Sequence, residues 1–364
     1  MSVYNSADYL REAIESILNQ TFTNFEFIIF DDSSTDDSWK IITEYTNQDD
    51  RIILIQNQEN IGLTKSLNKG IALAKGEYIA RQDADDVSLP ERFEKQVALL
   101  DQEPEVVLVS CNLELINSEG CITGMYQRAC APELVPWYLL FYNRLAGHSQ
   151  VVYRREIVKS LGSYSESRRY SQDYELWCRL AKVGQIAILP EILLQQRIHN
   201  NSISAAKRSE QKAYSLNQVR DNIKQLIKEE IDLEEVEDLR LFWIGHWWKC
   251  FPDTQKAGVL HSRLQQILQR FLQQNSQKHS AEITSRLYIL IGQQFIYWIR
   301  ALSIRNNLLE KIKISAYAFA WHPLGVVNYW LKDAWILQLR KLHILFNSNY
   351  QKDLQPNSEN SLRQ

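Results

Sequence analysis

One stretch of the sequence decides its fold class: Gly76-Glu77-Tyr78-Ile79-Ala80-Arg81-Gln82-Asp83-Ala84-Asp85-Asp86. Residues 77–81 are predicted to form a strand that runs into Asp83. An Asp-x-Asp alternation in extended backbone directs Asp83 and Asp85 to the same side. Such a pair suits a hard divalent cation whose other ligands are phosphate oxygens. The simpler interpretation is a solvated acidic turn, with Asp86 or Ser88 capping the helix that follows Pro90.

The segments around this stretch alternate between helix and strand patterns. Apolar residues recur at helical spacing in residues 10–18, 39–45, 63–71 and 93–100, and strand-like runs cover residues 25–30, 52–55 and 106–110. This alternation predicts an α/β fold with a mostly parallel sheet flanked by helices. Ligands of such sheets bind beyond the carboxyl ends of the strands. Asp31-Asp32 and residues 83–86 are both predicted to lie there.

Three further groups of polar residues are candidates for chemistry. Asp32 could accept hydrogen bonds from a uracil imide or a ribose, although Asp and Ser after a strand also cap helices. Asp173 falls in the first turn of a short predicted helix, where it is either an N-cap or a general base. Arg197 and His199 follow a strand-like run at residues 192–196, and a lone histidine is more often structural than a ligand.

Taken together and in this order, these motifs resemble glycosyltransferase family 2, whose catalytic domain has the GT-A fold. The resemblance extends from Ser2 to about Ser204 and rests mainly on residues 2–10, 30–36, 60–63, 76–86, 172–173 and 197–202. It implies a catalytic domain in residues 1–204. Because the chain starts at Met1, inside the family's opening turn, we expect the first strand of the sheet to be missing.

The resemblance also implies a role for each matching residue. Asp173 is the implied catalytic base. Asp83, Asp85 and His199 are the implied ligands of Mg²⁺ or Mn²⁺. The nucleotide sugar is expected to contact Val3, Tyr4, Asn5, Asp32, Asp83 and Arg197. One departure is Gln172, because members of the family usually have Glu before the base.

The implied reaction is inverting transfer of a hexose from a nucleoside diphosphate sugar, expected to be a UDP-sugar, to a hydroxyl acceptor. The acceptor is expected to be a carbohydrate or lipid-linked, in the synthesis of a cell-surface or extracellular polysaccharide. The alternative is an N-terminally truncated, inactive member that serves as a binding or partner subunit. A nucleotidylyltransferase would also use a carboxylate-bound metal, but residues 2–11 lack the Gly-rich loop that such enzymes usually carry.

Composition and charge exclude other classes. The net charge of −3 over 364 residues offers no basic field to nucleic acid. The five cysteines include no CxxC pair and indicate thiols in a reducing compartment. Neither a signal peptide nor a spanning helix of about 20 apolar residues is recognisable. We therefore expect a cytoplasmic protein.

From about residue 205 the pattern becomes helical and rich in aromatic residues. Residues 205–350 are predicted to form an all-helical region, and residues 351–364 a disordered tail. Tryptophan favours the membrane–water boundary, so peripheral contact with the inner face of the membrane is one interpretation. A helical bundle that buries the aromatic residues is the other. The tryptophans concerned are Trp243, Trp247, Trp248, Trp298, Trp321, Trp330 and Trp335.

Overall fold

The computed structural model of the protein describes residues 1–145, 147–199, 202, 207–245, 255–274, 281–303 and 308–332. The chain divides into two compact units. The first consists of Met1–Ile244 and Gln266–His279, and the second of Gly245–Gln265 and Ser280–Gln364. The tail expected at residues 351–364 lies outside the described residues.

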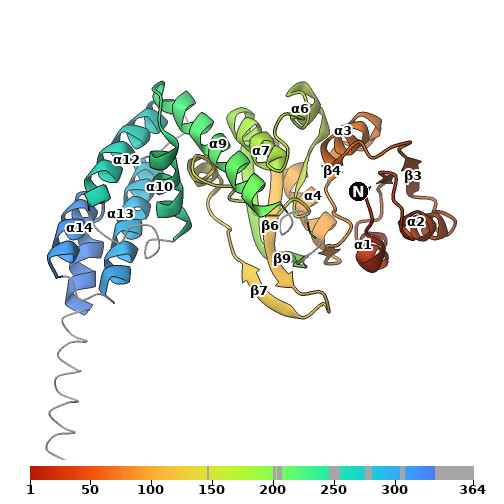
Figure 1. Ribbon diagram of the computed structural model, residues 1–364, viewed down its shortest axis with the longest axis horizontal. Helices are drawn as coiled ribbons and strands as arrows, with labels where there is room; N and C mark the ends of the chain where they lie inside the picture. Colours follow the sequence, from red (N-terminus) through yellow and green to blue (C-terminus); the bar gives the residue numbers. More distant parts are fainter. Residues whose placement is uncertain are drawn as a thin grey trace, which may run out of the picture. The chain divides into compact units, whose positions relative to one another are not determined.

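A parallel three-stranded sheet forms the N-terminal part of the first unit (Figure 1). Its strands are β1 (Ser2–Val3), β2 (Phe27–Asp31) and β3 (Ile52–Gln56), in the order β1-β2-β3. Helices α1 (Ala7–Leu18) and α2 (Ser38–Thr46) cover one face of this sheet, and α3 (Leu63–Leu73) packs against the other. The predicted alternation of helix and strand is confirmed here.

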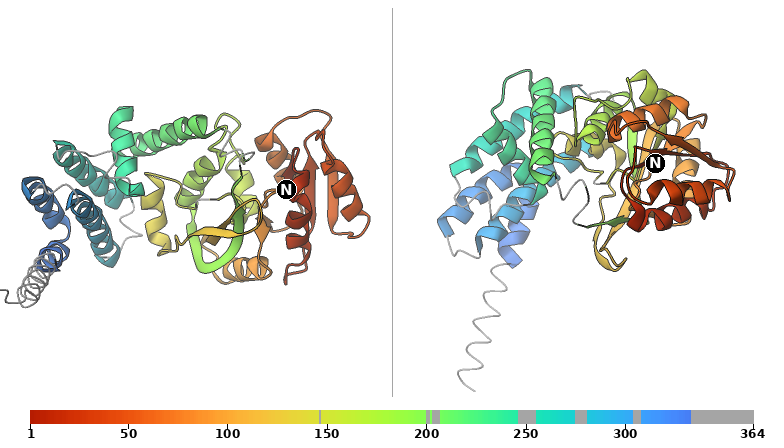
Figure 2. Two further views of the ribbon diagram at one scale, coloured as in Figure 1. Left: turned by 60° about the horizontal axis from the view of Figure 1, so that its bottom comes forward. Right: turned by 45° about the vertical axis from the view of Figure 1, so that its right-hand side comes forward.

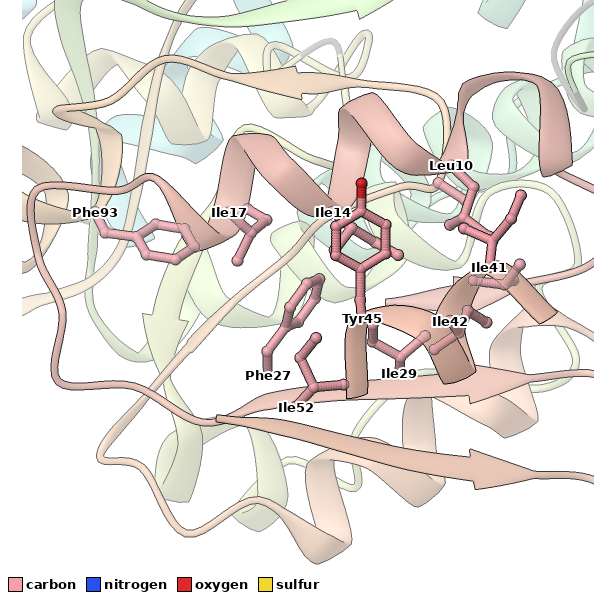
Figure 3. Close-up of a cluster of buried hydrophobic side chains, with 12 residues drawn as sticks. Leu10, Ile14, Ile17, Phe27, Ile29, Ile41, Ile42, Tyr45, Ile52 and Phe93 are labelled. Carbon is pink, nitrogen blue, oxygen red and sulfur yellow. The ribbon is translucent and has the colours of Figure 1, made fainter. Parts of the chain in front are cut away.

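The alternation of side chains along β2 produces this layering. Phe27 and Ile29 point towards α1 and α2, whereas the ring of Phe30 packs against Gly70 of α3. Figure 3 shows the cluster that Phe27 and Ile29 join. Its other labelled members are Leu10, Ile14 and Ile17 of α1, Ile41, Ile42 and Tyr45 of α2, Ile52 of β3, and Phe93. Helical spacing of apolar residues on α1 and α2 therefore buries one side of each helix.

The second sheet of this unit is mixed (Figure 2). It contains β4 (Tyr78–Ala80), β5 (Val87–Ser88), β6 (Val106–Ile116), β7 (Ile122–Tyr126), β8 (Val152–Arg154) and β9 (Gln185–Arg197). The order is β4-β8-β6-β9-β5, with β7 beside β6. Only β6 and β9 run parallel, while the other pairs are antiparallel. The sequence predicted a mostly parallel sheet throughout; the β6–β7 hairpin, closed by Gly120 at φ +80°, is one source of the difference.

Four α-helices and one short 3-10 helix accompany this second sheet in the described residues. They are α4 (Arg92–Gln102), α5 (Val135–Leu139), α6 (Arg155–Ser160) and α7 (Gln172–Val183), with a short 3-10 helix at Pro132–Leu134. The helix α7 buries Leu176, Trp177 and Leu180 on its inner side. This packing fixes the N-terminal turn of α7, which carries Asp173.

The first strand, which the sequence predicted to be missing, is present but short. β1 has two residues and pairs with β2 only at Phe30 and Asp31. No strand pairing joins β2 to β4 in the part of the chain that the structure describes. A cavity of about 750 Å³ lies between these strands, and apolar residues such as Phe27, Leu67 and Ile71 line it. We call it the β2–β4 cavity.

The helical region begins with α9 (Arg208–Ile227) and α10 (Leu233–Ile244), which belong to the first compact unit. There, Trp243 is buried against Trp137 and Phe141. The last described strand, β9, ends at Arg197, and α9 begins at Arg208; the boundary predicted at residue 204 lies outside the described residues, and the division by compactness falls after Ile244.

The helix α12 (Gln255–Gln274) contributes residues to both units, and α13 (Ala281–Ser303) and α14 (Leu308–Trp321) belong to the second. Trp298 and Trp321 are buried in that unit. Among the described residues, no helix combines the length and the apolar character needed to cross a membrane.

Candidate active site

The carboxyl end of β4 carries the acidic cluster that the sequence singled out. Asp83 forms an ion pair with the buried guanidinium of Arg81, and its other oxygen accepts a hydrogen bond from Ser149 Oγ at 3.0 Å. Burial alone would raise the pKa of Asp83, but Arg81, His148 and Ser149 together hold it below its ordinary value. Asp83 is therefore ionised and fixed in place.

The two carboxylates that follow are held by the end of β9. His199 Nε2 lies 3.0 Å from Asp85 Oδ2, and the backbone N–H of Arg197 donates to Asp86 Oδ1 at 3.0 Å. Burial and then the negative charge of Asp83 raise the pKa of Asp85. Burial together with the charges of Asp85 and Asp83 raises the pKa of Asp86 well above its usual range. Three carboxylates thus compete for positive charge at one strand end, so a cation here would be stabilised.

The residues expected to hold a metal ion come partly together. Asp85 and His199 are in direct contact, and Asp83 acts electrostatically on Asp85. Among the described residues, the buried Nδ1 atom of His199 has no hydrogen-bond partner. Within the described ranges, no three His, Cys, Asp or Glu side chains lie in an arrangement ready to hold a metal ion. The oxygen and imidazole donors nevertheless suit Mg²⁺ or Mn²⁺, whose other ligands would be phosphate oxygens.

The loops after β1 and β2 are tied to each other. Asn5 Oδ1 accepts a hydrogen bond from the backbone N–H of Thr35 at 2.8 Å, and Asn5 N–H donates to Ser34 Oγ at 3.1 Å. Asp36 accepts from the backbone N–H of Ala7, the first residue of α1. Tyr4 is half exposed beside them, whereas Val3 is buried. The predicted nucleotide-contacting residues 3–5 therefore stand at the rim of the sheet.

Asp32 is buried and fixes the loop that precedes α3. Its carboxylate accepts hydrogen bonds from the backbone N–H groups of Ile61 and Gly62, at 3.0 and 2.8 Å, and from Asn57 Nδ2 at 2.9 Å. Gly62 has a φ of +87°, which glycine adopts without steric cost. These bonds explain why an acid follows β2, and a contact with a nucleotide base stays a prediction.

Arg197 is buried and fully engaged in the structure. Its guanidinium donates to the carbonyl oxygens of Asp85 and Asn117 at 3.1 Å each, forms an ion pair with Glu12, and lies 4.6 Å from the ring centroid of Tyr9. A diphosphate could reach it only by displacing one of these partners. The role of Arg197 in nucleotide-sugar binding therefore stays a prediction.

Asp173 lies in the first turn of α7, and Ser171 occupies the N-cap position. The carboxylate accepts a hydrogen bond from Asn143 Nδ2 at 3.0 Å. Burial, with a smaller contribution from the negative charge of Asp83, raises the pKa of Asp173 to about 6. A base with a pKa near the working pH is suited to take a proton from a hydroxyl group.

Three uncharged ring side chains, His148, Tyr164 and Trp177, pack together near these carboxylates. His148 Nε2 lies 2.9 Å from the hydroxyl of Tyr164, and the ring of His148 lies edge-on to Trp177. Burial and the nearby charge of Arg81 lower the pKa of His148 to about 3. The imidazole is therefore neutral at physiological pH.

Arg81 and Asn143 of this site were given no role from the sequence, and His148 and Ser149, before the run Val151-Val152-Tyr153, were an ambiguous polar pair. Arg81 stands two residues before Asp83. In extended backbone this spacing directs both side chains to the same side, and so could have indicated their ion pair. Asn143 and Ser149 lie 30 and 66 positions from their partners, and no local pattern connects them.

Comparisons with known proteins agree on one family. The model of "Glycosyl transferase family 2" matches residues 1–140. The chain is 30% identical over 252 residues to an uncharacterized glycosyltransferase of Haemophilus influenzae, covering 67% of this chain and 78% of that protein. It is 34% identical over 209 residues to the Escherichia coli UDP-Glc:alpha-D-GlcNAc-diphosphoundecaprenol beta-1,3-glucosyltransferase, covering 57% and 79%.

A solved structure supports the same fold. The complex of S. aureus TarS 1–349 with UDP-GlcNAc aligns with a TM-score of 0.51 and 15% identity, covering 83% of this chain and 87% of that one. This likeness concerns the fold alone. Together with the relatives, it shows that the chain belongs to glycosyltransferase family 2 and has the GT-A fold.

Proposed function

We propose that the protein is an inverting, metal-dependent hexosyltransferase that uses a UDP-sugar and a hydroxyl acceptor in polysaccharide synthesis. One observation supports the proposal: Arg81, the ion-pair partner of Asp83, lies 3.4 Å from His148, whose ring lies edge-on to Trp177 of α7, the helix that carries Asp173 in its first turn. We infer that the base for the acceptor and the carboxylates for the leaving group act in one site.

Asp173 is the residue that takes the acceptor proton. Its ionised carboxylate accepts the proton of the hydroxyl as the hydroxyl oxygen attacks the anomeric carbon. Asn143 orients the carboxylate by its hydrogen bond at 3.0 Å. Attack from the side opposite the leaving group, in a single displacement, inverts the anomeric configuration. Gln172, which stands where family members usually have Glu, is buried beside the base and does not itself accept the proton.

The leaving group is a nucleoside diphosphate, whose negative charge has to be neutralised. A bound Mg²⁺ or Mn²⁺ would supply that neutralisation. Asp85 and His199 would hold it, with Asp83 oriented by Arg81 and Ser149 towards the metal or the ribose.

The donor nucleotide is proposed to bind at the rim formed by the loops after β1 and β2. Val3, Tyr4 and Asn5 line one side, and Asp32 the other. Arg197 would reach the diphosphate after release of Glu12. The hydrogen bonds between Asn5 and residues 34–35 support this proposal, because they hold both loops in one arrangement before the nucleotide arrives.

The acceptor is proposed to be lipid-linked and to be met at the cytoplasmic face of a membrane. The name of the E. coli relative specifies a diphosphoundecaprenol-linked sugar as its acceptor, which supports a similar class here. Contact with the membrane would then be peripheral.

A donor screen tests the proposal. The purified full chain is incubated with Mn²⁺, an undecaprenyl-diphosphate-linked sugar and, in turn, UDP-glucose, UDP-N-acetylglucosamine and GDP-mannose. Release of UDP that depends on both the acceptor and Asp173 supports the proposal. The β2–β4 cavity favours one alternative, a binding subunit without transferase activity. UDP-sugar binding by calorimetry without any release of UDP would favour that alternative.

A further inference from the structure

The second compact unit has a core that is mainly apolar and aromatic. Ile291, Phe295 and Ile299 of α13 are buried, as are Ile314 and Trp321 of α14. The indole N–H of Trp321 donates to Nδ1 of His261 at 2.9 Å. Of the tryptophans that the sequence offered for a membrane contact, Trp243, Trp298 and Trp321 are buried, whereas Trp330 is half-buried and its indole N–H donates to Ser315 Oγ at 3.1 Å. For the three buried tryptophans, the bundle interpretation is confirmed.

The outward side of α14 is also apolar. Leu309, Ile312 and Phe319 are 73%, 52% and 51% exposed, and they recur at positions that share one side of a helix. Residues 323–332 are helical as well, and Leu324, Val327 and Leu331 are exposed there at the same kind of spacing. α14 therefore has one apolar side that is buried, with Ile314, Ala318 and Trp321, and a second apolar side that is exposed in the described residues. We call these six side chains the α14 face.

The described part of the second unit, to which the α14 face belongs, has a strongly biased charge. The described residues of the second unit include seven lysines and arginines but only two acids, Glu282 and Glu310, although the whole chain has a net charge of −3. Both acids lie beside basic groups, Glu282 with Arg286 and Glu310 with Lys313. The basic residues are Lys256, Arg263, Arg286, Arg300, Lys311, Lys313 and Lys332.

We propose that the α14 face binds the surface of an anionic phospholipid membrane. An exposed apolar stripe flanked by lysines combines the two forces that hold peripheral proteins on such membranes, namely apolar burial and attraction to acidic head groups. A second copy of the chain fits less well, because it would bring two basic units together. The inference deepens the proposed membrane contact by naming its surface, and it does not depend on sugar transfer.

Vesicle co-sedimentation of the full chain tests the α14 face. At low salt the protein should pellet with vesicles of phosphatidylcholine mixed with phosphatidylglycerol, and it should pellet less with phosphatidylcholine alone. The double variant Leu309→Glu/Phe319→Glu should bind at least about tenfold more weakly, because two acids replace apolar contacts beside acidic head groups. Ile122→Glu/Met125→Glu on β7 is a matched control, because these side chains are similarly exposed, at 58% and 53%, and it should bind like the wild type.

Several results would overturn this proposal. They are wild-type protein that stays in the supernatant with anionic vesicles, equal pelleting of the two double variants, and a concentration-dependent dimer in ultracentrifugation that only the α14 variant loses. The last result would identify the face as an interface between two copies. Circular dichroism checks that both variants fold. Failure of UDP release in every chain would count against the proposed function and leave the vesicle result unaffected.

Discussion

Replacing Asp173 with asparagine keeps the shape of the side chain and removes its charge. The carboxylate lies in the first turn of α7, where burial raises its pKa to about 6. If Asp173 is the base, the variant should lose about 10²–10⁴-fold in kcat. Binding of the donor should persist, because the residues proposed to hold the nucleotide lie in the loops after β1 and β2.

The same substitution should raise stability. A pKa of about 6, against about 3.9 for an ordinary aspartate, corresponds to about 3 kcal/mol between the two protonation states. Because folding raises this pKa, the free energy of unfolding falls as the pH rises from about 4 to about 6. Asparagine cannot ionise and avoids this loss. At pH 8 the variant should therefore be more stable than the wild type by about 2–3 kcal/mol, and near pH 4 the difference should vanish.

Urea titrations at pH 8 and pH 4, paired with measurements of UDP release, provide the test. Asp8→Asn is the matched control, since Asp8 occupies the same position in the first turn of α1 but is exposed. Its activity should be unchanged, and its stability should not rise at pH 8. If Asp173→Asn keeps full activity and is no more stable at pH 8 than the wild type, Asp173 is only a carboxylate at a helix terminus, and the assignment of the base is wrong.

Three further outcomes are expected. The wild-type kcat/KM should fall below a pH of about 6, where Asp173 gains a proton. Asn143→Ala should move this acidic limb of the pH profile to higher pH, because the lost hydrogen bond favours the ionised form of Asp173. An unchanged pH profile would contradict the positioning role of Asn143. Excess EDTA should abolish UDP release and Mn²⁺ should restore it, and Asp85→Ala should remove most activity while circular dichroism shows that the chain stays folded. Full activity in EDTA would exclude the metal. Asp32→Ala should lower the free energy of unfolding by about 1–3 kcal/mol, because it leaves the N–H groups of Ile61 and Gly62 without their acceptor. The control Asp37→Ala removes an exposed carboxylate and should change the free energy of unfolding little.

The packing of helices on the N-terminal sheet could be predicted because it depends on local sequence patterns. The apolar residues of α1 and α2 recur at helical spacing, Asp32 directly follows β2, and Asp83 lies three residues after the end of β4. The parallel or antiparallel direction of the strands in the second sheet could not be predicted in this way. It depends on which strands pair, and β6 pairs with β8 and β9 across 40 to 80 intervening residues.

The partners of the site residues were also beyond the sequence. Nothing local indicates that Asp32 binds backbone N–H groups of residues 61–62, or that Glu12 neutralises Arg197. Likewise, the sequence offered two interpretations of Trp243 and Trp321, and tertiary packing decides between them. Trp247, Trp248 and Trp335 lie outside the described residues.

The β2–β4 cavity gives the two halves of the site some independence. The loops proposed to bind the nucleotide follow strands of one sheet, and the acidic cluster follows a strand of the other. In the described residues no strand pairing joins β2 to β4 across the cavity. The spacing between the loops after β1 and β2 and the acidic cluster after β4 therefore depends on side-chain packing at the cavity, which is softer than a strand ladder. A small apolar compound lodged in the cavity would stiffen this spacing from behind, without touching the donor. Occupancy of the β2–β4 cavity would in that way affect the site at the carboxyl ends of the strands.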